Sequence, residues 1–206
     1  MGRIIGGGLP IVKFTDNQVF VGTANAFNGT IAIGDPPSSG NRLVVVGIYA
    51  AGTTTVSVLL GGVASTRVIT GNDPDFWQLV IPTGTTCTIR VNQSVVSTYI
   101  INVLVWTISN LQSTTATANV KTTANPSPLS LNVGSRSATL GMATNVGASS
   151  SFTWTGLNED YQTSATVNNN PHTGAHLVKG SAATPLTVSV SRSAPSVARG
   201  IAATWR

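Results

Sequence analysis

The sequence predicts an all-β fold, built as an antiparallel β-sandwich. Short runs rich in β-branched residues recur along the 206 residues, each ended by Gly, Pro, Asn or Asp, and this is the pattern of strands and turns. No segment keeps the spacing of about 3.6 residues between apolar side chains that an amphipathic helix requires. Many short strands with frequent turns favour a sandwich over a fold in which strands and helices alternate.

The predicted strands form two groups that are separated by a polar stretch over residues 112–128. In chain order the strands are expected at residues 18–22, 29–33, 42–49, 55–60, 63–69, 76–81, 86–91, 98–108, 129–133, 138–144, 151–154, 176–178, 186–190 and 200–205.

Two kinds of strand can be told apart within this set. In residues 86–91, the apolar Cys87, Ile89 and Val91 alternate with polar residues, so one face of this strand is expected to be buried and the other exposed. Residues 42–49 and 99–106 are instead almost continuously apolar. They are predicted to be central strands that are covered on both faces or paired across an interface.

Residues 1–28 are predicted to be an extended N-terminal arm and lead-in, and residues 29–206 a single sandwich domain. Three glycines at positions 6–8 and Pro10 disfavour regular structure at the start of the chain. Free termini usually fray unless they are docked. The arm is therefore expected to anchor the protein to a neighbouring subunit, with packing on its own sandwich as the alternative. The anchoring side chains are predicted to be Ile4, Ile5, Leu9, Ile11 and Val12.

Several stretches of the sequence combine apolar strand runs with Gly-containing turns. They are GNRLVVVG at 40–47, GGVASTR at 61–67 and FWQLVIPTGTTCTIRV at 76–91, continued by residues 129–133, 152–161 and 201–205. On these residues the chain resembles the jelly-roll-like accessory virion domain of tailed bacteriophages, of the capsid-decoration or head-fibre type. The resemblance implies a jelly-roll-like sandwich and carries no catalytic residue. Ala64 and Ser65 depart from it, since a large apolar residue usually precedes the threonine there.

Composition and charge exclude several classes of protein. Only 8% of the residues are charged, which disfavours disorder, and a single cysteine forms no internal disulfide. No apolar run reaches the length of about 18 residues that spans a bilayer. The formal net charge of +5 arises from 11 basic and 6 acidic residues. The basic residues are scattered singly along the sequence, so nucleic acid is not expected as the main ligand. No secretory signal is present, which predicts synthesis in the host cytoplasm.

Enzymatic, cofactor and metal sites are not predicted. The sequence has no nucleophile elbow of the Gly-x-Ser-x-Gly type and no phosphate-binding P-loop. His172 and His176 have the spacing of a helical metal pair, but Pro171 and Gly174 disfavour a helix, so they are interpreted as exposed loop histidines. Cys87 is interpreted as a buried packing residue rather than a nucleophile.

The paired carboxylates are interpreted in the same way. Asp73 and Asp75 flank a proline and are expected to form a turn, with a calcium site as a remote alternative. Glu159 and Asp160 are adjacent, and adjacent side chains on an extended chain point to opposite faces. They are therefore poorly placed to act together in glycoside hydrolysis.

A glycan-binding platform is the alternative that the sequence leaves open. Trp154, Asn158 and Tyr161 place aromatic rings beside hydrogen-bonding groups, and amphipathic aromatic side chains suit sugar binding. The favoured interpretation is that Trp154 ends a core strand and that residues 158–161 turn the chain.

The expected function is that of a non-enzymatic structural protein of a tailed-bacteriophage virion, which decorates or cements the capsid shell. Its expected partners are the major capsid protein or other virion proteins, and it is expected to form a homo-oligomer, a trimer or larger. The alternative is a head-fibre or tail adhesin module that binds host-surface glycans. A secreted bacterial lectin is disfavoured because no secretory signal is present.

Overall fold

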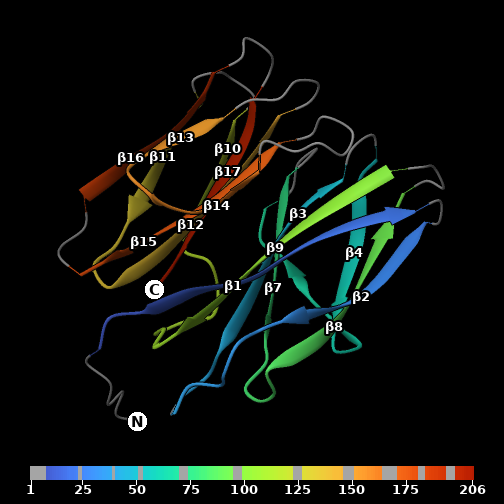
Figure 1. Ribbon diagram of the computed structural model, residues 1–206. Helices are drawn as coiled ribbons and strands as arrows, with labels where there is room; N and C mark the ends of the chain where they lie inside the picture. Colours follow the sequence, from blue (N-terminus) through green and yellow to red (C-terminus); the bar gives the residue numbers. More distant parts are fainter. Residues whose placement is uncertain are drawn as a thin grey trace.

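The computed structural model describes residues 8–22, 25–38, 40–50, 53–69, 74–94, 99–122, 127–145, 151–163, 171–180, 184–193 and 198–206 (Figure 1). These residues form seventeen strands and no helix, and every pairing between strands is antiparallel. The predicted all-β, antiparallel sandwich architecture is confirmed.

Nine strands from the first part of the chain form two sheets. They are β1 (Ile11–Gly22), β2 (Ala26–Ala32), β3 (Leu43–Ala50), β4 (Thr55–Leu60), β5 (Val63–Ala64), β6 (Thr66–Arg67), β7 (Asp75–Val80), β8 (Thr86–Gln93) and β9 (Tyr99–Ser109). Sheet A has the order β1-β9-β3-β7-β6, and sheet B has the order β2-β8-β4-β5.

Eight strands from the second part form two further sheets. They are β10 (Ala118–Thr122), β11 (Ser127–Val133), β12 (Ser137–Asn145), β13 (Phe152–Thr155), β14 (Asn158–Thr163), β15 (His172–Lys179), β16 (Thr184–Arg192) and β17 (Ala198–Trp205). Sheet C has the order β10-β17-β12-β15-β14, and sheet D has the order β11-β16-β13.

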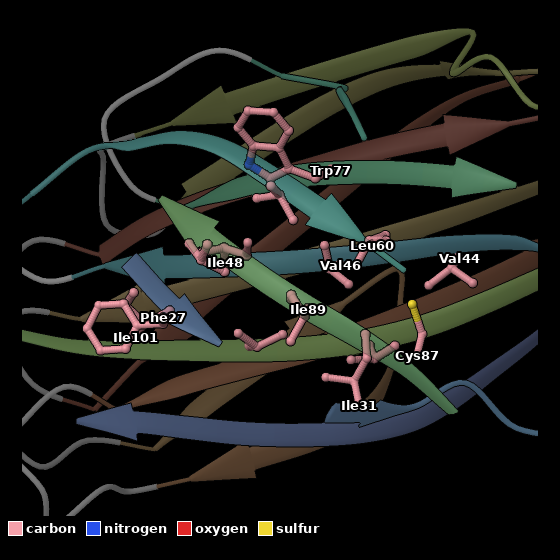
Figure 2. Close-up of a cluster of buried hydrophobic side chains, with 14 of the residues drawn as sticks. Phe27, Ile31, Val44, Val46, Ile48, Leu60, Trp77, Cys87, Ile89 and Ile101 are labelled. Carbon is pink, nitrogen blue, oxygen red and sulfur yellow. The ribbon is translucent and has the colours of Figure 1, made fainter. Parts of the chain in front are cut away.

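The four sheets are stacked in the order B, A, C, D, with a buried apolar layer between each pair. Val46, Ile48 and Ile89 lie between sheets B and A, in the cluster that Figure 2 shows. Leu104 and Trp106 of β9 lie between sheets A and C, together with side chains of β12 and β17. The layer between sheets C and D is formed by side chains from β11, β12, β13, β15, β16 and β17 and from the β13–β14 turn.

The two inner sheets explain the continuous apolar runs of the sequence. Every residue of β3 is buried, with Val44 and Val46 in the B/A core and Leu43 and Val45 in the A/C core. Such a strand shows no polar alternation because both of its faces are covered. The prediction of a central strand at residues 42–49 is confirmed.

The two halves of the chain have the same strand order. Replacing β1, β9, β3, β7 and β6 by β10, β17, β12, β15 and β14 converts sheet A into sheet C, and replacing β2, β8 and β4 by β11, β16 and β13 converts sheet B into sheet D. Only β5 has no counterpart. The structure therefore contains two copies of one sandwich, where the sequence analysis assigned residues 29–206 to a single one.

Contacts across the A/C interface are reciprocal between these copies. Phe14 of β1 stacks on Tyr161 of β14, while the Asn119 side chain of β10 donates to the carbonyl of Val68, directly after β6. Near the centre, β3 faces its own counterpart, since a Cβ built on Gly47 would lie 2.8 Å from the sulfur of Met142. This pattern indicates an approximate two-fold axis that runs along the strands between β3 and β12.

A bulge allows β1 to contribute to two cores. The register of β1 against β9 shifts between Phe14 and Asp16, and one extra residue reverses the face to which the following side chains point. Before the bulge, Val12 and Phe14 pack in the A/C core, and after it Phe20 packs in the B/A core. The region assigned to an arm and lead-in thus contains strands of sheets A and B from Ile11 onward.

Two strands were not predicted, and both lie at edges of sheet C. Strand β10 falls within the polar stretch 112–128, and β14 replaces the turn that was expected at residues 158–161. The turn expectation is wrong: the chain turns at Gly156, where φ is +85°. Edge strands with polar side chains give no apolar alternation, which is why the sequence did not reveal them.

Candidate functional site

The proposed glycan platform is not assembled as one surface. Trp154 is half-buried in the C/D core, and its Nε1 donates to Thr173 Oγ1 at 3.0 Å. Tyr161 packs instead in the A/C core, where it stacks on Phe14 at 5.8 Å. Asn158 is exposed at the start of β14. The two aromatic rings therefore lie on opposite faces of sheet C, and the rings of Trp154 and Tyr161 cannot contact one sugar together.

A partly buried polar cluster lies where β14 of sheet C faces β9 of sheet A. Asp160 lies at the bulge of β14, where the register against β15 shifts. One of its oxygens accepts a hydrogen bond from Trp106 Nε1 at 2.8 Å, and the other lies 2.6 Å from Nδ1 of His176. The Asp160 side chain is 8% exposed and that of His176 is 26% exposed. The carboxylate thus ties an edge strand of sheet C to the centre of sheet A.

An aspartate that orients a histidine is two-thirds of a nucleophile-activating triad. A hydroxyl or thiol would have to hydrogen-bond to the second ring nitrogen of His176 to complete it. Among the described residues, Asp160 is the only side chain that hydrogen-bonds to His176. The arrangement therefore supports a structural role, in which two donors satisfy a buried carboxylate.

The structure corrects the interpretation of the two histidines as loop residues. His172 and His176 both lie on β15, where a separation of four residues corresponds to about 13 Å along a strand. His172 is buried against Tyr161, with ring centroids 5.6 Å apart, and His176 is held by Asp160. This separation is too large for both histidines to bind one metal ion. In the described parts of the chain, no three metal-ligating side chains gather.

Cys87 occupies the place that the alternation of its strand predicted. It is 7% exposed and belongs to the B/A core (Figure 2). Burial raises the pKa of the Cys87 thiol above its ordinary value, although Gly61 and Arg42 oppose this shift. A thiol in this environment is a packing residue rather than a nucleophile.

The carboxylates that were considered for catalysis differ in their burial and in their partners. Asp75 belongs to β7 rather than to a turn, and its Oδ2 lies 2.6 Å from Nη2 of Arg67. Burial raises the pKa of Asp75 to about 6, against the hydrogen bond and charge of Arg67, which lower it. Its second oxygen is buried without a hydrogen-bond partner. Glu159 is exposed, and Asp73 lies outside the described residues.

The predicted anchoring side chains divide into three groups. Ile4 and Ile5 lie outside the described residues. Val12 packs against the A/C core of its own chain, so this side chain is not available to a neighbour. Leu9 and Ile11 are 47% and 48% exposed. They are the part of the predicted anchor that the structure places on the surface.

The segment that carries Leu9 is held by one residue from each half of the chain. The Asn110 side-chain amide donates to the carbonyl of Leu9 at 3.3 Å, and the Arg136 guanidinium donates to the carbonyl of Gly8. Both residues have left-handed backbones, with φ of +60° and +55°. Asn tolerates this conformation, whereas nothing in the sequence signals it at Arg136. Sequence reasoning missed both of these positions.

No protein-family model and no curated protein matches the chain. Among the described residues there is also no helix long and apolar enough to cross a membrane.

Proposed function

We propose that the chain is a non-enzymatic structural protein of a tailed-bacteriophage virion, which decorates or cements the capsid shell through protein contacts. The observation that carries this proposal is the exposed apolar segment at Leu9 and Ile11, clamped to both halves of a thick β-stack. Such a segment is unfavourable on a free monomer and favourable once a neighbour covers it, since burying each side chain contributes about 1.5–3 kcal/mol.

The strand order supports the jelly-roll-like topology that the resemblance to virion modules implies. In the first half, sheet A contains the order β1-β9-β3-β7 and faces sheet B, which contains β2, β8 and β4. In the second half, sheet C contains the order β10-β17-β12-β15 and faces sheet D, which contains β11, β16 and β13. Two interleaved Greek keys produce this order in a double-sheet jelly roll. Two such units stacked face to face form a body with three buried layers.

The outer face of sheet D suits a passive shell. The outward side chains that the structure describes on β11, β13 and β16 carry hydroxyl or amide groups: Ser130, Asn132, Thr153, Thr155, Thr187, Ser189 and Ser191. None of these side chains is charged or aromatic, so this face lacks the aromatic rings that the adhesin alternative requires. We therefore favour decoration over glycan binding. A trimeric or larger assembly remains part of the proposal.

The proposal is tested by locating the chain in particles. Virions are purified from cells that carry the gene and imaged by electron cryomicroscopy, beside particles from a deletion strain. Density at regular lattice positions of the shell, lost in the deletion strain, is the expected result. Density at a vertex or on the tail would support the head-fibre or adhesin alternative. Absence of the chain from the particles would overturn both.

A further inference from the structure

Basic side chains that are distant in sequence gather at one end of the molecule. We name this surface the basic end and define it by Lys13, Arg136, Lys179 and Arg206. It is the end at which β1 and β12 begin and β15 and β17 finish, as the pairing of Ser137 with Lys179 shows. The termini of the described chain also lie on this side (Figure 1).

Direct contacts place Arg136 and Lys179 beside the Gly8–Leu9 segment. The Arg136 side chain binds the carbonyl of Gly8, and Leu9 lies against Gly180, next to Lys179. The Arg206 side chain passes over Gly134, within 3.4 Å of the position of a built Cβ. Lys13 lines an open cavity of about 350 Å³ together with Ile11 and Asn110.

The basic end carries most of the net charge of the protein. It has four basic side chains, and one carboxylate among the described residues that line the adjoining cavity, Asp35. This excess of three compares with a formal net charge of +5 for the whole chain. The basic residues are scattered singly in the sequence, but the fold concentrates them.

We propose that the basic end is a docking surface for an acidic face of a partner protein, with Leu9 and Ile11 inserted at its centre. This inference rests on the proposed function, for which it specifies the chemistry of the partner. Apolar side chains at the centre and charged groups at the rim are the usual anatomy of a protein interface. The charged rim steers association and fixes orientation.

A protein partner fits this surface better than a nucleic acid does. Single-stranded nucleic acids bind basic grooves in which aromatic side chains stack on the bases. The exposed large apolar side chains of the described residues are all aliphatic, and the two at this end are Leu9 and Ile11. Aliphatic side chains beside lysine and arginine match a protein surface that carries Asp and Glu around an apolar pocket.

The test compares two charge reversals of equal size. Lys179→Glu with Arg206→Glu alters the basic end, whereas Arg90→Glu with Lys121→Glu alters exposed residues on β8 and β10, away from it. A third variant, Leu9→Asn with Ile11→Asn, removes the apolar centre. Binding is measured for genome-free shells from the deletion strain by co-sedimentation, and for a 20-residue polyglutamate peptide and a 20-nucleotide oligothymidylate by fluorescence anisotropy.

We expect the basic-end reversal to weaken shell binding at least tenfold. A loss of this size corresponds to about one pair of charge-assisted contacts. The asparagine variant should weaken shell binding at least fivefold and leave peptide binding unchanged. The control reversal should keep most of the shell binding. Circular dichroism of each variant confirms that the fold is retained.

Three results would overturn the inference. They are equal losses in the two reversals, no effect of the basic-end reversal on shells, and loss of oligothymidylate binding in that variant with shells still bound. A fourth result separates the two proposals. If the wild-type chain ignores shells but binds the peptide through the basic end, the virion assignment fails and the acidic-partner inference stands.

Discussion

The two sandwiches have the same strand order, but they fill their cores from opposite sides. In the first half, Val44, Val46 and Ile48 of β3 project into the B/A core. In the second half, the corresponding positions of β12 are Thr139, Gly141 and Ala143, and the volume comes from the opposite layer. There Leu157 and Trp154 lie over Gly141, at 2.6 and 2.8 Å from a built Cβ.

This difference shows that one topology tolerates two distributions of side-chain volume. What the fold requires is that each layer between two sheets is filled to native density, whichever sheet supplies the large side chains. The two halves therefore share no visible sequence repeat. Counterpart positions become recognisable only through strand order and register, and such pairs provide matched experiments.

The largest expected difference lies at Arg42, which directly precedes β3, and at its counterpart Ser137, the first residue of β12. All five N–H groups of Arg42 donate to carbonyls, those of Ile33, Gly34, Ile81, Thr83 and Gly84, at 2.6 to 3.1 Å. Ser137 makes one hydrogen bond, to the carbonyl of Gly134. Arg42→Ala should lower the free energy of unfolding by about 4 kcal/mol or more, and Ser137→Ala by about 1 kcal/mol. Urea unfolding measures both.

Arg42→Lys is the matched control for charge. A lysine keeps the cation but lacks the planar fork that reaches two loops at once. It should therefore restore less than half of the lost stability. Equal effects of Arg42→Ala and Ser137→Ala would contradict the role of Arg42 as the clamp of the first half.

The second prediction compares two glycines whose lack of a side chain leaves space for a neighbouring side chain. A Cβ at Gly174 would lie 2.5 Å from Trp106, which is fully buried in the A/C core and held by Asp160. A Cβ at Gly141 would meet Leu157 and the half-buried Trp154 in the C/D core. Gly174→Ala should cost about 3 kcal/mol and Gly141→Ala about 1–2 kcal/mol, because the second site can move its neighbours.

Gly134→Ala provides the control for backbone entropy in this pair. At that position a built Cβ meets only the flexible side chain of Arg206, at 3.4 Å. The change in unfolding free energy should stay below about 0.5 kcal/mol. If Gly141→Ala were more damaging than Gly174→Ala, the A/C layer would be the more adaptable one, contrary to the packing argument.

The third prediction concerns a buried carboxylate whose counterpart is a hydroxyl. Asp75 in β7 corresponds to Thr173 in β15, which accepts from Trp154 and donates to the carbonyl of Tyr161. Burial raises the pKa of Asp75 from 3.8 to about 6. The folded chain therefore holds this proton more tightly than the unfolded chain. The stabilisation from this group is fully present below about pH 3.8 and is lost as the pH rises through about 6.

Asp75→Asn removes this titration. Relative to the wild type, the variant should gain about 2 kcal/mol of stability between pH 4 and pH 7, because the ionised carboxylate destabilises only the wild type in that range. Urea unfolding at pH 4, 5, 6 and 7 gives this difference directly. A difference that stays constant over these four values would show that Asp75 titrates normally.

Much of the fold could be predicted from the sequence, because buried strands are either apolar at every second residue or continuously apolar. The strands at residues 55–60 and 86–91 are examples, and the burial of Cys87 followed from alternation alone. The strands β10 and β14 could not be found, since their side chains are largely polar and their pairing depends on neighbours distant in sequence. The basic end escaped detection for the same reason. Lys13 and Arg206 are separated by almost the whole chain, and only the meeting of the two halves brings them to one surface.

The smallest expected effect tests whether both halves hold the N-terminal segment. Arg136→Gly and Asn110→Gly relieve left-handed backbones, which disfavour a residue with a side chain by about 1–2 kcal/mol and Asn by less. Each variant also loses a hydrogen bond to an exposed carbonyl, so the change in global stability should stay below about 1 kcal/mol. Cleavage of residues 8–11 by proteinase K should nevertheless accelerate in each variant, and most in the double variant, because the clamp has one member in each half. Asn132→Ala, at an exposed position of β11, should leave the rate unchanged. If only one of the two glycine variants accelerated cleavage, one half alone would hold the segment.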